Sequence, residues 1–158
     1  MQARPAEASD IAILSRLWFD GWHDAHGKIV PASLVEARTL DHLSARMRTA
    51  LGNVWTIGPK QAPLGFYILK HDELDQFYVC KQARGSGIAA LLIADAETRL
   101  LQSGHSAAWL ACAIGNWRAA RFYEKNGWLQ SGKATVELQA PDGPFPLQVW
   151  RYEKRLAP

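Results

Sequence analysis

The stretch Leu74-Asp75-Gln76-Phe77-Tyr78-Val79-Cys80-Lys81-Gln82-Ala83-Arg84-Gly85-Ser86-Gly87-Ile88-Ala89 decides how this sequence folds. It begins as a run of aromatic and branched residues typical of a β-strand, passes through a polar turn with two glycines, and then opens a helix. The backbone N–H groups of such a turn, together with the first turn of the helix, attract anions. The stretch therefore predicts a site for a phosphorylated ligand.

Two common phosphate motifs do not match the turn. It lacks the Gly-Lys-Ser/Thr end of a P-loop, and Ala90 stands where a G-x-G-x-x-G fingerprint has its last glycine. Gly85 and Gly87 have no Cβ, so a pyrophosphate can approach their amides closely, and Arg84 and Lys81 can neutralise its charge. Taken alone, the turn is equally compatible with a tight connection that binds nothing.

Length and composition predict one compact domain spanning residues 1–158. The net charge is only +3 and the 18 Lys and Arg are scattered, which argues against a nucleic-acid partner. No apolar run reaches the roughly 18–20 residues that span a bilayer, and the N-terminus lacks the apolar core of a signal peptide. The two cysteines, Cys80 and Cys112, suit a reducing cytoplasm and lack metal-ligand spacing, so no metal is expected.

The periodicity predicts an α+β fold in the order β-α-α-β-β-β-α-β-α-β-β. The helix-type segments are Ile11–His26, Leu34–Leu51, Gly87–Ser103 and Trp117–Asn126, the last capped by Asn116. The strand-type segments are Met1–Pro5, Val54–Gly58, Leu64–Lys70, Leu74–Val79, Ala107–Ala113, Trp128–Gln139 and Pro146–Tyr152. Short links favour antiparallel hairpins before residue 79, whereas the following helix crossover favours parallel pairing of Ala107–Ala113 with Leu74–Val79.

A second motif strengthens the interpretation of the turn. The segment Asn116-Trp117-Arg118-Ala119-Ala120-Arg121-Phe122-Tyr123-Glu124-Lys125-Asn126-Gly127-Trp128 resembles the N-x-x-A-x-x-F-Y-x-x-x-G-F/W element of the GCN5-related N-acetyltransferases (GNAT). The turn Gln82–Gly87 resembles the Q/R-x-x-G-x-G/A motif of the same family. Both motifs and the order of the elements match, so the resemblance extends over essentially the whole chain. It implies a mixed central sheet of about seven strands flanked by about four helices.

The resemblance also implies where acetyl-CoA binds. In this family two parallel central strands splay apart after a bulge in the fourth strand, and acetyl-CoA lies in the cleft between them. The pantetheine arm and thioester would contact the backbone of Phe77, Tyr78 and Val79 and the side chain of Asn116. The pyrophosphate would be held by Gln82, Arg84, Gly85, Ser86, Gly87, Ile88 and Ala89. A plain helix cap is the alternative role of Asn116, and Lys81 departs from the Pro that many members carry.

Tyr123 and Asp75 are the candidate catalytic residues. Transfer of an acetyl group to an amine expels a thiolate, and a phenol with a pKa near 10 can donate a proton to it. The family places such a tyrosine at this point of the motif, although a core aromatic is the alternative. Asp75 is the candidate base for the amine, with Glu73 as second choice. Strand alternation predicts that Asp75 shares a face with Phe77 and Val79.

The acceptor pocket of the family is built from the first two helices, their connecting loop and the late strands. Here that region offers Trp18, Trp22 and His23 as candidate substrate contacts, with His26 and Trp55 nearby. His23 and His26 have helical spacing for a metal but no third ligand nearby, and the tryptophans also suit a core.

The sequence as a whole therefore predicts a cytoplasmic, acetyl-CoA-dependent N-acetyltransferase acting by direct attack in a ternary complex. Its acceptor would be the amine of a small molecule, peptide or protein. A homodimer is compatible with the family, and a non-catalytic acyl-CoA-binding or interaction module is the alternative function. No motif identifies the amine.

Overall fold

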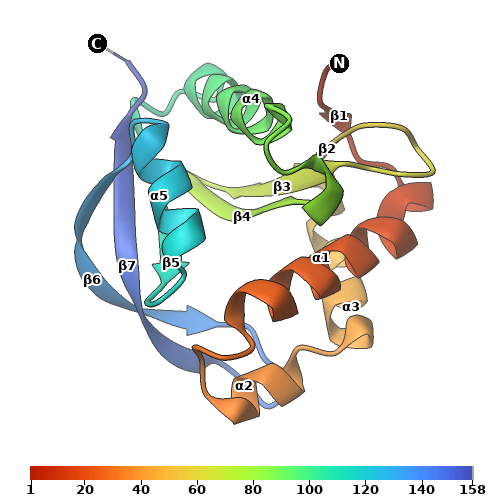
Figure 1. The fold of residues 1–158 in the computed structure, drawn as a ribbon, viewed down its shortest axis with the longest axis vertical. Coiled ribbons are helices and arrows are strands. Elements are labelled where there is room, and N and C mark those ends of the chain that lie inside the picture. Colours follow the sequence, from red (N-terminus) through yellow and green to blue (C-terminus); the bar gives the residue numbers. More distant parts are fainter. Residues whose placement is uncertain (158) are drawn as a thin grey trace.

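A computed structural model describes residues 1–157. The helices are α1 (Ile11–His26), α2 (Ala32–Ala37), α3 (Leu40–Ala50), α4 (Ile88–Gln102) and α5 (Trp117–Lys125). The strands are β1 (Arg4–Pro5), β2 (Val54–Ile57), β3 (Gly65–Lys70), β4 (Glu73–Val79), β5 (Ala107–Ala113), β6 (Leu129–Leu138) and β7 (Phe145–Arg155). Apart from one additional helix, this is the predicted order (Figure 1).

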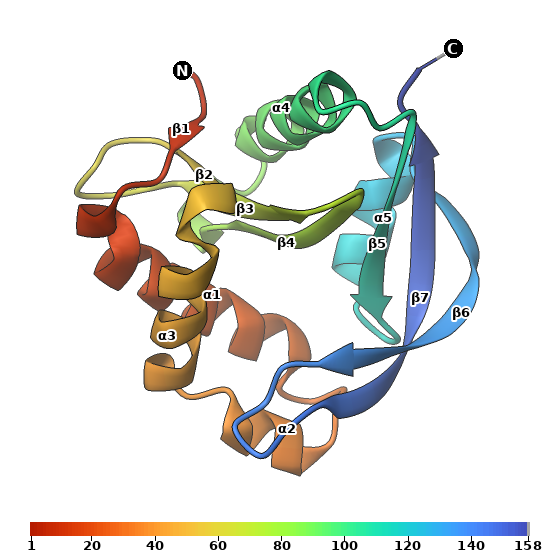
Figure 2. The ribbon, with the colours of Figure 1, turned by 180° about the vertical axis from the view of Figure 1, so that it is seen from behind.

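The strands within residues 1–157 form one seven-stranded sheet in the order β1-β2-β3-β4-β5-β7-β6. All neighbours are antiparallel except β4 and β5, which confirms both the predicted hairpins and the predicted parallel pair. The parallel pair is registered at a single position, Glu73 opposite Trp109. Beyond that position β4 and β5 diverge, and the opening between them is visible in Figure 2.

Each face of the sheet carries its own core. The apolar stripe of α4, which includes Leu92, Ile93 and Leu100, packs with α5 against one face. Leu14 and Trp18 of α1 pack with α3 against the other face (Figure 1). The predicted inward faces of both long helices are therefore confirmed, and the two layers hold the opening between β4 and β5 in place.

The predicted helix Leu34–Leu51 is wrong as one element. The chain leaves helical geometry at Arg38, where ψ is 62°, and Thr39 then caps α3 by accepting a hydrogen bond from the His42 amide at 3.0 Å. Residues 1–157 therefore contain five α-helices instead of about four. The break turns α2 toward the β6–β7 hairpin, which the predicted continuous helix would not do (Figure 2).

The predicted face of Asp75 is also wrong, because β4 bulges there. The pairing of β3 with β4 shifts between Ile68 and Leu69, and the extra residue of β4 is Asp75. Phe77 and Val79 pack on the core beneath α4, whereas Asp75 lines a pocket on the opposite side of the sheet. The bulge thus moves a carboxylate from an apolar face to a polar cavity.

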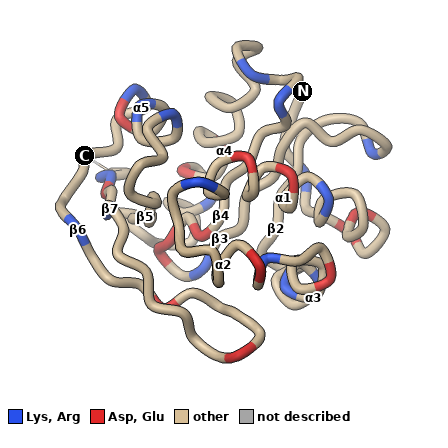
Figure 3. The backbone as a smooth tube through the Cα atoms, turned by 60° about the horizontal axis from the view of Figure 1, so that its bottom comes forward, with Lys and Arg blue, Asp and Glu red and all other residues tan. Residues whose placement is uncertain are grey.

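The surface carries both signs of charge. Basic and acidic residues are interspersed along the tube in Figure 3, in keeping with the net charge of +3. Within residues 1–157, the helices are too short or too polar to cross a membrane.

Gly21 is required where α1 crosses β4. A Cβ at Gly21 would lie 2.8 Å from Cδ1 of Tyr78, so the ring or the helix would have to move. Alanine ordinarily stabilises a helix relative to glycine, yet Gly21→Ala is expected to lower the free energy of unfolding by about 1–2 kcal/mol through overpacking. Urea unfolding measures this. Gly52→Ala is the control, since its Cβ would meet open space; equal effects of the two variants would contradict the expectation.

Candidate active site

The glycine turn after β4 has the geometry of an anion site. Gly85 and Gly87 adopt φ of +77° and +88°, which favour glycine, and a Cβ at either position would point into open space. α4 begins directly after Gly87, so the N–H groups of its first turn have no carbonyl of the helix to bond. No acidic residue lies in that first turn. The turn therefore presents free amides at an exposed, positive helix end.

The other predicted residues of the turn lie where they can support it. The Ser86 hydroxyl donates to the Ala83 carbonyl and accepts from the Ile88 amide at 3.4 Å, which holds the turn closed. Gln82 and Arg84 are exposed, whereas Ile88 and Ala89 are half-buried. The structure thus brings the predicted residues Gln82 to Ala89 together around one open turn.

Asp24 of α1 joins the two sides of the strand opening. Its carboxylate accepts from Arg84, after β4, at 2.9 Å and from Arg118, at the start of α5, at 3.0 Å. Hydrogen bonds from Arg84 and then Arg118 hold the pKa of Asp24 below its usual value. Two guanidinium groups therefore meet at Asp24, one from the glycine turn after β4 and one from α5, which follows β5.

The opening contains a cavity of about 70 Å³, here called the small cavity. Its walls include Phe77 and Tyr78 from β4 and Asn116 and Tyr123 from α5. The side chain of Asn116 accepts from the Ala119 amide at 3.4 Å, so the predicted helix cap is present. Beyond Glu73, β4 has no strand partner on its β5 side within residues 1–157, which leaves its backbone groups available on that edge.

Tyr123 is a buried phenol at the wall of the small cavity. Its side chain is 9% exposed and packs against Phe77, with ring centroids 6.4 Å apart. Burial raises the pKa of Tyr123, so the hydroxyl keeps its proton at neutral pH. Within residues 1–157 this hydroxyl forms no hydrogen bond, whereas the hydroxyls of Tyr67 and Tyr152 are bound by Asp95 and Glu124. Tyr123 is thus a proton donor without a protein partner.

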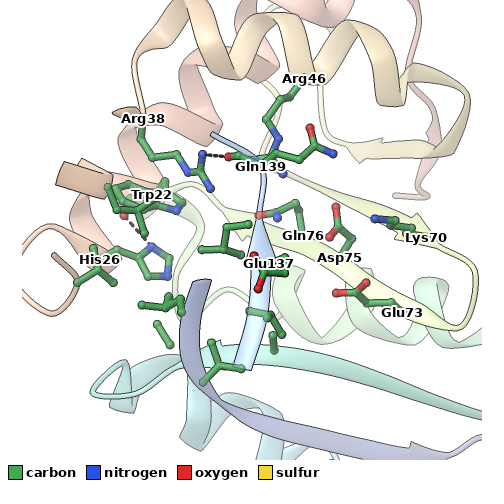
Figure 4. A pocket seen from close by; sticks show the side chains of 18 of the residues that line it. Trp22, His26, Arg38, Arg46, Lys70, Glu73, Asp75, Gln76, Glu137 and Gln139 are labelled. Atoms are coloured by element: carbon green, nitrogen blue, oxygen red, sulfur yellow. Dashed lines mark hydrogen bonds between the residues drawn. The ribbon is translucent and has the colours of Figure 1, made fainter. Parts of the chain in front are cut away.

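A larger pocket of about 480 Å³, here called the large pocket, adjoins the small cavity. Its walls come from α1, the α2–α3 region, β4, β5 and the β6–β7 hairpin, as Figure 4 shows. Asp75, Gln76, Tyr78 and His26 line both cavities. A molecule in the large pocket can therefore meet one in the small cavity beside the bulge of β4.

Carboxylates with raised pKa values lie at this junction. Burial, followed by repulsion from Asp75, raises the pKa of Glu73 to about 7, and burial raises the pKa of Asp75. His26 is buried, which lowers its pKa to about 4, and its Nδ1 lies 2.9 Å from the Trp22 carbonyl oxygen. At neutral pH the imidazole is neutral, so the acids are the titrating groups here.

The predicted aromatic contacts divide between site and core. Trp22 lines the large pocket, whereas Trp18 is 1% exposed in the core and supports the Arg46 guanidinium, 4.8 Å from its ring. His23 binds the Arg38 backbone carbonyl through Nε2 at 2.7 Å and lies behind the pocket wall. In the part of the chain that the structure describes, no cluster of three His, Cys, Asp or Glu is placed to hold a metal.

Three charged residues that line the large pocket were not predicted from the sequence. They are the bases Arg38 and Arg46 and the acid Glu137 on β6. The sequence does contain one indication that Arg46 faces inward. It follows the buried Leu43 by three residues and directly precedes the buried Met47, so it lies near the buried stripe of α3. Arg38 and Glu137 reach the pocket only through the helix break and the hairpin, which no local pattern marks.

Comparison with known proteins agrees with this geometry. The family model described as "Acetyltransferase (GNAT) family" matches residues 40–128, more than half of the chain. A search of curated protein sequences finds no significant match. Among solved structures, a GCN5-related N-acetyltransferase from Rhodopseudomonas palustris superposes with a TM-score of 0.75 at 20% identity, covering 97% of this chain and 94% of its own.

Two further structures share the fold. The PaiA N-acetyltransferase from Thermoplasma acidophilum, in complex with coenzyme A, gives a TM-score of 0.67 at 17% identity, with 98% of both chains covered. The ribosomal-protein-S18-alanine N-acetyltransferase from Escherichia coli gives 0.65 at 14% identity, covering 99% of this chain and 94% of its own. With the matching family model, the splayed strands and the glycine turn, these findings lead to one conclusion: the chain belongs to the GNAT family of acetyltransferases.

Proposed function

We propose that the protein is an N-acetyltransferase that moves the acetyl group of acetyl-CoA to a primary amine by direct attack within a ternary complex. The observation that carries the proposal is the junction of two cavities at the bulge of β4. Tyr123, whose hydroxyl has no partner within residues 1–157, lines one cavity, Glu73 lines the other, and Asp75 lines both. An acid for the leaving group and a base for the amine thus flank one reaction point. Amine-dependent release of free CoA thiol tests the proposal.

The residues present fit coenzyme A. The free amides around Gly85 and Gly87, with Arg84 and Arg118 beside them, suit a pyrophosphate. The unpaired edge of β4 over Phe77–Val79 offers the backbone groups that amides of a pantetheine arm require. When bound, acetyl-CoA supplies an acetyl thioester. The PaiA enzyme, which has the same fold and was solved in complex with coenzyme A, supports coenzyme A as the ligand.

The side chains of this protein then divide the proton transfers. Asp75, at the junction, accepts the proton that the ammonium must lose before its nitrogen can attack. Tyr123 donates its proton to the departing sulfur as the carbon–sulfur bond breaks. Burial, and after it the charge of Asp75, raises the pKa of Glu73 to about 7, so Glu73 is a second proton acceptor close to neutral pH. Asn116 caps α5 with its side-chain carbonyl, and its amide NH₂ would be left to contact the pantetheine.

The raised pKa values of Asp75 and Glu73 lead to an expected pH dependence of the reaction. A base acts when it is deprotonated, and burial raises the pKa of Asp75, so kcat/KM is expected to rise with pH through a midpoint above the ordinary range of an aspartate. Glu73→Gln is expected to leave that midpoint in place, because the charges that shift the pKa of Asp75 are those of Arg46 and Lys70. Asp75→Asn is expected to lower the plateau about 30-fold. The measurement is kcat/KM between pH 5.5 and 9 for the three proteins; an unchanged profile in Asp75→Asn would place the base elsewhere.

A further inference from the structure

The large pocket contains charges of both signs that do not pair with one another. Arg38, Arg46 and Lys70 line it together with Glu73, Asp75 and Glu137. Within residues 1–157 none of these six forms a salt bridge within 4.0 Å, although ion pairs occur elsewhere on the fold. Partly buried charges are costly unless a partner compensates them. Unpaired charges of opposite sign in one cavity therefore indicate a ligand that carries both.

The charges are distributed along the pocket, and Arg46 lies near enough to Asp75 for each to shift the pKa of the other. In Figure 4, Arg38 and Arg46 approach Gln139 at one end of the large pocket, whereas Glu73 and Asp75 lie toward the other end beside Lys70. The acidic end adjoins the small cavity through Asp75. The reacting amine thus belongs at the acidic end, and the basic end is left to another group of the same ligand.

Arg38 shows that the basic end lacks an acceptor. Its side chain is almost fully buried, and Nη1 donates to the Gln139 carbonyl and lies 3.0 Å from Nε2 of His42. Its Nε, however, is buried without any hydrogen-bond partner within residues 1–157. A guanidinium with an unused buried donor and no carboxylate nearby is suited to a ligand carboxylate.

Arg46 supplies the second cation. It lies over Trp18, 4.8 Å from the ring centroid, and forms no salt bridge within 4.0 Å in residues 1–157, although the charge of Asp75 acts to raise its pKa. Burial lowers the pKa of both arginines, and that of Arg38 falls to about 10, so both are still charged at neutral pH. Since Arg38 also anchors the β6–β7 hairpin through Gln139, Arg46 is the residue whose loss tests ligand binding with least effect on the fold.

We propose that the acceptor is an amino acid with an apolar side chain, bound as a zwitterion, a deepening that rests on the proposed acetyl transfer. Its carboxylate contacts Arg46 and Arg38, and its ammonium faces Asp75 and Glu73. The side chain packs against aliphatic residues that line the same pocket, which are Val30, Leu34, Val136, Leu138, Leu147 and Val149. A volume of about 480 Å³ accommodates such a molecule.

The test compares L-leucine with L-leucinamide and 3-methylbutylamine, which lack the carboxylate. Wild-type protein is expected to acetylate L-leucine with a kcat/KM at least about 30-fold above that of either analogue. Arg46→Met is expected to remove most of this preference, chiefly through KM for L-leucine, and Arg46→Lys is expected to retain part of it. Arg48→Met, on the exposed side of α3, serves as the matched control and is expected to keep the preference.

Binding of L-leucine, measured by calorimetry with and without CoA, separates this inference from the proposed function. Acetylation of all three amines at similar rates, or an equal loss on all three in Arg46→Met, would overturn the inference and keep the acetyltransferase. If neither these three amines nor a wider panel with polyamines and short peptides is acetylated, the proposed function fails. In that case binding of L-leucine that depends on Arg46 supports the zwitterion pocket, and absence of binding overturns it.

Discussion

Replacing Tyr123 by phenylalanine is expected to lower kcat about 100-fold while leaving the Kd for acetyl-CoA within about twofold of the wild-type value. The hydroxyl of Tyr123 faces the small cavity and has no hydrogen-bond partner within residues 1–157, so its removal leaves no buried group unsatisfied. The ring, which packs against Phe77, stays in place. The loss should therefore fall on the step in which the sulfur takes a proton.

Single-turnover kinetics and calorimetry with acetyl-CoA measure the two quantities separately. Tyr67→Phe is the matched control, because it also removes a tyrosine hydroxyl, one that is bound to Asp95 on α4 and lines neither the small cavity nor the large pocket. That variant is expected to lose stability but not turnover. A Tyr123→Phe protein with wild-type kcat across the pH range would remove the phenol from the mechanism.

Gly87→Glu is expected to weaken acetyl-CoA binding at least about 100-fold. The substitution places a negative charge where a pyrophosphate would meet the free amides of the turn and α4. It also forces a side chain onto a backbone with φ of +88°. Because a Cβ at this position meets open space, the core is untouched and the protein should still fold.

The matched control for this variant is Gly104→Glu at the other end of α4. Gly104 has a similar φ of +95° and equally open surroundings, so it carries the same backbone strain without the anion site. Titration calorimetry is expected to give wild-type affinity for Gly104→Glu and none measurable for Gly87→Glu. Equal affinities in the two variants would refute the phosphate site.

Features encoded by local patterns were predicted well from the sequence. The bounds of α1 and β5 agree with the prediction, and the helix start after Gly87 and the Asn116 cap were marked by their own residues. These elements position the small cavity, so the cofactor side of the candidate site was also predictable. In each case a periodic stripe or a capping residue specifies the element without help from distant parts of the chain.

The acceptor side was not predictable, because distant contacts shape it. The break at Arg38 contains no glycine or proline, and it is stabilised by the Thr39 cap and by the long-range bond of Arg38 to Gln139. The bulge at Asp75 depends on the register with β3, which strand alternation cannot reveal. The raised pKa of Glu73 follows from burial and from the neighbouring Asp75, so it too required the folded chain.

The central claim is that the protein transfers the acetyl group of acetyl-CoA to an amine. Amine-dependent release of CoA thiol measures this transfer most directly. A panel of amino acids, simple amines, polyamines and short peptides should include acceptors that accelerate thiol release well above the rate in buffer. Mass spectrometry should detect one acetylated amine for each thiol released. Acetyl-CoA that binds at the glycine turn while no amine accelerates thiol release would contradict the account and identify a non-catalytic acyl-CoA-binding module.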